Sequence, residues 1–222
     1  MAIWLLALAE KSAADSRQDS IPRRLAWVVN RRVVVDQATN EVEQIRRRVN
    51  DPAIVELEPI RSTLRKLSGE TSGEILGIRT LRGQFEDNAE WRDDPSRPAV
   101  IVGAVDMIGS RLLFSGYGVG FKARPLHAGF LGQDVLLVHD EAHLEPAFQE
   151  LLVTIREEQR RCGEFSKFHV MALSATSRAK NGAFGLTEAE KNLPSEMPDS
   201  AEQPLREICA GRALRNKSAR IS

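Results

Sequence analysis

Two adjacent acids that follow a short apolar run are the residues of this chain best placed to do chemistry. Residues 135–138 are apolar, and Asp140 and Glu141 come directly after His139. Such a run predicts a buried strand of a parallel sheet, and ligands bind at the carboxyl ends of such strands. There an Asp can hold Mg²⁺, and a neighbouring Glu can orient or deprotonate the water that attacks a γ-phosphate. The acids could instead cap the next helix, since Asp is a good N-cap residue, so both interpretations stay open.

A second strand-end motif favours the chemical interpretation. Residues 169–173 form another apolar run, and Ser174, Ala175 and Thr176 follow it. The two strand ends and the helix between them resemble motifs II and III of superfamily 2 helicases. The first strand ends in Asp-Glu-Ala-His, as in helicases of the DEAH-box type, and the second ends in Ser-Ala-Thr.

This resemblance implies a role for each of the motif residues. Asp140 is expected to serve Mg²⁺, and Glu141 is expected to activate the attacking water. Ser174 and Thr176 would link hydrolysis to strand movement, and His143 would be the coupling residue that faces them.

The composition describes a globular protein without a global charge bias. Of 222 residues, 42% are hydrophobic, which is ample for a buried core in one large or two small domains. Lys and Arg total 31, as do Asp and Glu, so any contact with nucleic acid must come from local clusters. Cys162 and Cys209 show no metal-ligand spacing, which fits a reducing cytoplasm. The apolar residues 1–9 have no basic region before them and are too short to span a membrane, so they predict a buried helix.

Strands and helices alternate along most of the chain. Helices are expected over residues 1–14, 31–49, 53–67 and 104–114, and strands over 24–29, 75–81, 99–103, 135–138 and 169–173. This alternation predicts a doubly wound, mainly parallel α/β domain over residues 1–178, followed by a loosely ordered tail over 179–222. His127 and His169 are expected at the surface or at strand ends.

One junction between a strand and a helix has the residues of an anion site. Asn30, Arg31 and Arg32 lie where the strand over 24–29 gives way to a helix. Backbone N–H groups and guanidinium groups converge on anions at such a point, and a nucleic-acid phosphate is a suitable one. Two arginines at a helix start could equally be solvated, so this pattern alone does not decide.

Three longer stretches narrow the resemblance. Residues 27–37 (WVVNRRVVVDQ), 80–83 (TLRG) and 102–118 (VGAVDMIGSRLLFSGYG) closely resemble the DNA-contacting motifs of the CRISPR-associated helicase of type I systems, nearest to the subtype labelled U and now G. The likeness covers residues 1–180. It implies an ATP-driven translocase on single-stranded DNA that works with a guide-RNA-loaded surveillance complex and a nuclease in antiviral defence. The segments expected to line the DNA track are Asn30, Arg31 and Arg32, then Arg82 and Gly83, then Asp106 to Arg111.

The sequence departs from this family in three ways. No Gly-x-x-x-x-Gly-Lys-Ser/Thr loop occurs, and the earliest glycine is Gly69. Nothing after Thr176 resembles a second RecA-like domain, and no histidine-aspartate nuclease domain is found. The chain therefore resembles a fragment of a first RecA-like domain that lacks the phosphate-loop strand, and we expect it not to retain Mg²⁺ and ATP by itself. Two alternatives are a remnant that binds DNA without ATP turnover and an unrelated regulator in which Asp140 and Glu141 bind a structural metal.

Overall fold

A sheet of five parallel strands forms the centre of the structure, a computed structural model that describes residues 1–13, 21–68, 74–81, 96–163 and 168–174. The strands lie in the order β2-β3-β1-β4-β5, and every neighbouring pair is parallel. Their bounds are β1 Arg24–Val29, β2 Gly77–Leu81, β3 Ala99–Ala104, β4 Val135–His139 and β5 Phe168–Ala172.

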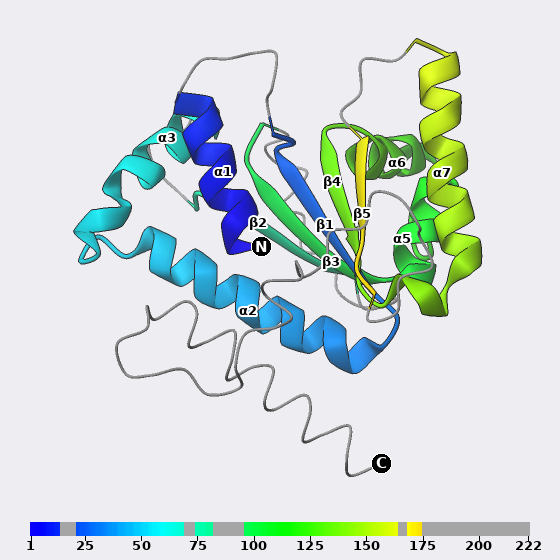
Figure 1. Ribbon diagram of the computed structural model, residues 1–222, viewed down its shortest axis with the longest axis horizontal. Coiled ribbons are helices and arrows are strands. Elements are labelled where there is room, and N and C mark those ends of the chain that lie inside the picture. The colour runs from blue at the N-terminus through cyan, green and yellow to red at the C-terminus, as the bar shows by residue number, and fades with distance from the viewer. Residues whose placement is uncertain (14–20, 69–73, 82–95, 164–167, 175–222) are drawn as a thin grey trace, which may run out of the picture. The chain divides into compact units, whose positions relative to one another are not determined.

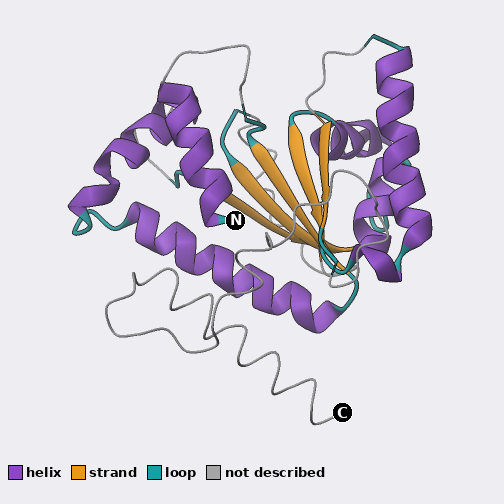
Figure 2. Ribbon diagram, in the orientation of Figure 1, coloured by secondary structure: helices purple, strands orange, loops and turns teal. Residues whose placement is uncertain are grey.

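Helices cover both faces of this sheet (Figure 1). Helices α1 Ala2–Ala13, α2 Arg32–Asn50 and α3 Glu58–Ser68 lie on one side, and α5 Val105–Leu112, α6 Arg124–Gly132 and α7 Pro146–Arg161 lie on the other (Figure 2). Three short 3-10 turns are η2 Val55–Leu57, η3 Phe121–Ala123 and η4 Ala142–Leu144. This arrangement confirms the predicted doubly wound α/β fold with a parallel sheet.

The apolar runs that predicted strands are buried as a doubly covered parallel sheet requires. All six residues of β3 are buried, and Leu137 of β4 has no exposed surface. Burying one such leucine contributes about 1.5–3 kcal/mol. Strand β4 lies between β1 and β5, in the interior of the sheet, as its sequence predicts. Strand β5 is an edge strand in the described part of the chain, and its Met171 is 49% exposed.

The helices on the α5 side differ from the expectation more than those on the α1 side. Helix α6 was not predicted, although Pro125 in its first turn is a common start signal. His127 of this helix is only 1% exposed, so its expected place at the surface or at a strand end is wrong.

The helix expected over 53–67 begins later, at Glu58, because Asp51 accepts a hydrogen bond from the Ala53 amide and starts a turn there.

A buried arginine ties α3 to the end of α2. The Arg61 side chain is 3% exposed and donates to the carbonyl oxygens of Val49 at 2.8 Å and Asp51 at 2.5 Å. It also forms an ion pair with Glu58. The last carbonyls of a helix have no partner within the helix, so Arg61 satisfies the carbonyl of the buried Val49. At Asp51 it adds a second donor, since that carbonyl also accepts from the Ile54 amide at 3.3 Å.

Replacing Arg61 by Ala should therefore lower the free energy of unfolding by about 2–4 kcal/mol, since the Val49 carbonyl loses its charged donor and the packed arginine side chain is removed. Urea unfolding followed by circular dichroism measures this loss. Lys66→Ala, an exposed change in the same helix, is the matched control and should stay within about 0.5 kcal/mol of the parent. Equal stability of the two variants would contradict the capping role.

The chain divides into two units, Met1–Thr176 and Ser177–Ser222, and every described residue belongs to the first. Within the described ranges, no helix is both long enough and apolar enough to cross a bilayer.

Candidate functional site

Four candidate residues meet at one edge of the sheet because the strands are parallel. Asn30 follows β1, Asp106 lies at the start of α5 just after β3, Asp140 follows β4 and Ser174 lies just beyond β5. In Figure 1 this carboxyl edge is where α2 and α7 begin. Ligands of open α/β sheets bind along such an edge.

The Asp140–Glu141 turn has an unusual backbone. Glu141 has φ 52° and ψ 44°, a left-handed conformation that non-glycine residues rarely adopt. Its amide donates to Oδ1 of Asp140 at 3.0 Å. Such strain costs about 1–3 kcal/mol and persists only when the surrounding structure fixes it.

Hydrogen bonds from two neighbouring strands fix this turn. The Asp140 amide donates to the Val28 carbonyl of β1 at 2.9 Å, and the Ala142 amide donates to the Leu173 carbonyl beyond β5 at 2.9 Å. The Asn30 side chain donates to the Glu141 carbonyl at 3.2 Å. The backbone of Glu141 is thereby fixed at the strand edge, and the residue is exposed there.

A buried histidine supports Asn30. His139 has no exposed surface, and its Nδ1 accepts a hydrogen bond from the side-chain amide of Gln149 on α7. Its Nε2 then carries the proton and donates to Oδ1 of Asn30 at 3.3 Å. The ring also packs edge-on against Phe148 with centroids 5.0 Å apart. Gln149, His139 and Asn30 thus form a relay that ends at the Glu141 carbonyl.

Burial lowers the pKa of His139 below its usual value, while the nearby Asp140 charge opposes part of this shift. In the unfolded chain the ring titrates at its ordinary pKa of about 6.5. The unfolded state therefore binds more protons between the two values, and stability should fall as the pH falls below about 6.5.

Urea unfolding at pH 7.5 and 5.5 measures this dependence, which amounts to about 1.4 kcal/mol for each unit by which the pKa is lowered. The variant His139→Asn cannot titrate in this range and should lose part of the difference between the two pH values. An unchanged difference in the variant would assign the pH dependence to other groups.

The two helicase-like motifs touch each other. The Ser174 hydroxyl and Nδ1 of His143 share a hydrogen bond of 3.1 Å between η4 and the end of β5. This contact joins the residues that the resemblance pairs as coupling partners. Ala175 and Thr176 lie outside the described residues.

The acids suit Mg²⁺ that arrives with a nucleotide. Within the described ranges no three His, Cys, Asp or Glu side chains gather into a metal site. Mg²⁺ in phosphoryl-transfer sites needs only one or two carboxylates, because phosphate oxygens and water complete its shell. Asp140, which is half-buried at the strand end, would hold the ion, and the exposed Glu141 would face the water.

The residues expected on a DNA track have different surroundings. Arg31 is exposed at the N-cap of α2, Arg32 begins that helix, and Asp106 is exposed in the first turn of α5. Arg111 is only 4% exposed and donates to the Met107 carbonyl of its own helix at 2.9 Å, so it packs inside the fold in this structure. Arg82 and Gly83 lie outside the described residues.

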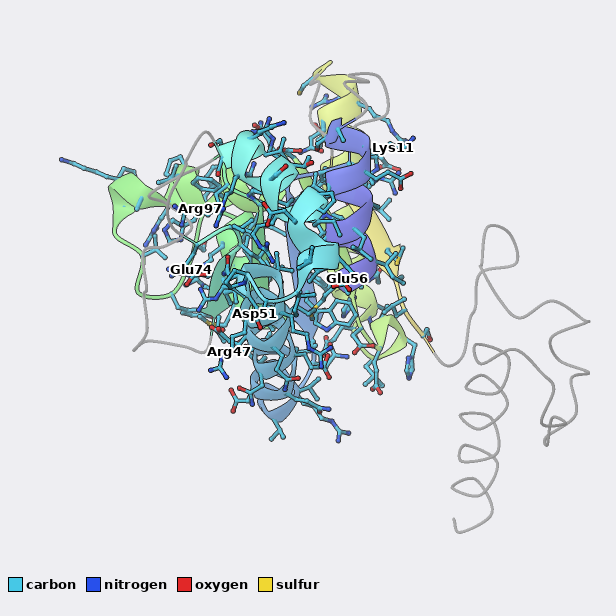
Figure 3. The ribbon with its side chains drawn as sticks, turned by 90° about the vertical axis from the view of Figure 1, so that its left-hand side faces the viewer. Lys11, Arg47, Asp51, Glu56, Glu74 and Arg97 are labelled. Atoms are coloured by element: carbon cyan, nitrogen blue, oxygen red, sulfur yellow. The ribbon has the colours of Figure 1, made fainter. Side chains whose placement is uncertain are left out.

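Elsewhere, a surface cavity of about 370 Å³ lies at the end of α2, on the side shown in Figure 3, where Arg47, Asp51 and Glu74 are labelled. Arg46 pairs there with Glu43 at 2.8 Å and lies 3.8 Å from Glu74. The cavity is lined by three acids and two arginines, so it carries little net charge with which to attract a charged ligand.

The supporting residues Gln149 and His139 were not predicted as part of the site. Their only sequence signal is a polar residue at the end of an apolar strand and another on the following helix.

Comparisons of this chain with protein-family models, with curated proteins and with solved structures find no match.

Proposed function

We propose that this domain is the first motor domain of an ATP-dependent translocase on single-stranded DNA. In this proposal it belongs with the CRISPR-associated type I helicases of subtype U or G, and it works in the cytoplasm with a guide-RNA-loaded surveillance complex in antiviral defence. Asp140 holds Mg²⁺ and Glu141 activates water. In this proposal a phosphate-binding loop and a second motor domain complete the site, and none of the 222 residues matches the loop pattern.

One observation carries the proposal: the Asp140–Glu141 turn is fixed by groups from both neighbouring strands. Asn30 and the Leu173 carbonyl both bond this turn, and His143 bonds Ser174. A turn that only capped a helix would not need this support, and Glu141 makes no side-chain cap bond to η4. The strained backbone instead presents a carboxylate to the edge where nucleotides bind.

A second candidate function is a DNA-binding module without ATP turnover. It is favoured by the absence of a glycine-rich phosphate loop from the 222 residues. Both functions need the exposed Arg31, but only the motor needs the two acids.

The deciding experiment joins the chain in frame to a phosphate-loop segment and a second motor domain from a helicase of the family it resembles. The motor function predicts ATP hydrolysis that oligo-dT stimulates and that Asp140→Ala removes. Absence of DNA-dependent hydrolysis in the joined protein, with DNA binding intact, would favour the binding module.

A surface along which single-stranded DNA of any base sequence can move must contact the phosphates of that strand. Arg31→Ala should therefore weaken binding of oligo-dT and lower the slope of log affinity against log salt by about 0.7, one phosphate's share. Fluorescence anisotropy over a salt series measures the slope. Arg48→Ala, an exposed change at the opposite end of α2, is the control and should leave the slope unchanged. If Arg31→Ala also leaves it unchanged, that side chain does not reach the backbone of the strand.

A further inference from the structure

Three aromatic side chains are exposed in the segment that joins α5 to α6. Phe114 is 56% exposed, Tyr117 is 58% exposed and Phe121 is 83% exposed. Phe114 and Tyr117 lie two and five residues after the end of α5, and Phe121 begins η3. We refer to Phe114, Tyr117 and Phe121 as the aromatic platform. Rings exposed to water lack the burial that stabilises most aromatic residues, so a binding partner that covers the platform would be stabilised by it.

The segment that carries the platform is well ordered by its own hydrogen bonds. The amides of Ser115, Val119 and Ala123 donate to the carbonyls of Ser110, Gly116 and Gly120 at 2.7, 3.2 and 2.9 Å. The fold leaves no room for a side chain at Gly116, where a Cβ would lie 2.8 Å from Cγ of Arg111. The buried Arg111 therefore acts as a support beneath this segment.

The backbone at Phe114 is strained. Its φ is 58°, in the left-handed region that bulky residues avoid. The left-handed residue ends α5, because it lets the Ser115 amide donate to the Ser110 carbonyl. The backbone that carries the exposed ring of Phe114 is thereby fixed.

The charged residues in the segment that carries the platform all have one sign. Residues 107–133 contain no Asp or Glu, although the whole chain has equal numbers of acids and bases. Lys122 is exposed and Arg124 is half-buried within the same segment. Aromatic faces beside cations and without acids match the bases and phosphates of a single nucleic-acid strand, since bases stack on rings and phosphates meet the cations.

We propose that Phe114, Tyr117 and Phe121 form a stacking platform for the unpaired bases of single-stranded DNA, with Lys122 and Arg124 beside its phosphates. The proposal deepens the proposed function, because it adds base contacts to the phosphate contacts of the DNA track. Duplex DNA keeps its base faces covered, so the platform favours single strands. Stacking is available to every base, which suits a protein that binds without sequence preference.

The test measures binding of the full 222-residue chain to two fluorescent oligomers of equal charge, one of twenty thymidines and one of twenty abasic units. Tyr117→Ala and Phe121→Ala should each weaken binding to the thymidine oligomer by about 5-fold to 150-fold, as expected for loss of one stacked base. Neither change should affect the abasic oligomer or the salt slope. Lys122→Ala should lower the slope by about 0.7 on both oligomers.

Leu126→Ala is the matched control, because this residue is 47% exposed in the same region but has no ring. It should stay within about twofold of the parent, since stacking requires a π face. Tyr117→Phe keeps the ring and should restore binding. Circular dichroism and thermal melting check that each variant is folded.

A second measurement does not depend on variants. Tyr117 is the only tyrosine of the chain, so photo-crosslinking with an oligomer containing 5-iododeoxyuridine should yield a peptide modified at Tyr117, Phe114 or Phe121. Equal loss of binding on both oligomers, no loss on either, or a parent chain that binds neither would overturn the platform. The assays contain no ATP, so the platform can hold while the motor function fails, and the motor function can hold while the platform fails.

Discussion

Glu141→Gln is expected to lower ATP turnover by about 10²–10⁴ in the chain completed with a phosphate loop and a second motor domain, because the change removes the group that handles the attacking water. Glutamine keeps the size and the hydrogen-bonding capacity of the side chain but cannot accept the proton. Affinity for nucleotide and for single-stranded DNA should stay close to that of the parent, since Glu141 acts on the reaction and not on binding. Steady-state phosphate release, with binding measured separately, tests both halves of this expectation.

The control for this prediction is Glu145→Gln. Glu145 is exposed four residues further on and lies at the N-cap of α7, so it shares the local charge but not the strained turn. Its replacement should leave turnover within about twofold. If Glu141→Gln stays within about tenfold of the parent, which is about 1.4 kcal/mol of barrier, Glu141 is not the base.

The parallel sheet could be predicted because its signal is local and redundant. The strand β1 was expected at 24–29 and found there, since an unbroken apolar run flanked by charged or polar residues has few other structures available. Strands β3 and β4 were found within one residue of the expected ends for the same reason. The edge where the acids meet then follows from the shared direction of the strands.

Helix α6 and the buried His127 could not be predicted in the same way. The segment from 113 to 132 mixes glycines, aromatics and cations without a clear period, so its sequence indicates a loop more strongly than a helix. Packing against α5 and β4 stabilises α6 in spite of this, with Leu131 fully buried. Tertiary contacts of this kind are not encoded in any window of sequence that includes only one element.

The acids of the candidate site could be predicted from the sequence, but the residues that hold their turn in place could not. Asp140 and Glu141 follow a strand and can be found from order alone. The relay from Gln149 through His139 to Asn30 joins three elements that are up to 119 residues apart in the sequence. Asn30 was expected on the DNA track, and the structure gives it a second task in holding the Glu141 turn.

The 222-residue chain by itself is expected neither to bind ATP tightly nor to hydrolyse it. A triphosphate is normally held by consecutive backbone N–H groups of a glycine loop at a helix N-terminus, together with one lysine. Lys11 and Ser12 lie near the end of α1, and no glycine comes before Gly69, so the sequence offers no such loop. Asp140 and Glu141 would repel the polyphosphate unless Mg²⁺ lay between them, which leaves an affinity weaker than about 1 mM.

Calorimetric titration of the chain with Mg-ATP, alongside a phosphate-release assay, measures this expectation. Micromolar binding or steady turnover by the chain alone would contradict it and would require a phosphate site built from other residues. The complementary variant adds a strand and a Gly-Lys-Thr loop ahead of α1. Affinity for Mg-ATP should then rise at least tenfold, whereas the same addition with the loop lysine changed to alanine should gain little, since the cation that meets the phosphates would again be missing.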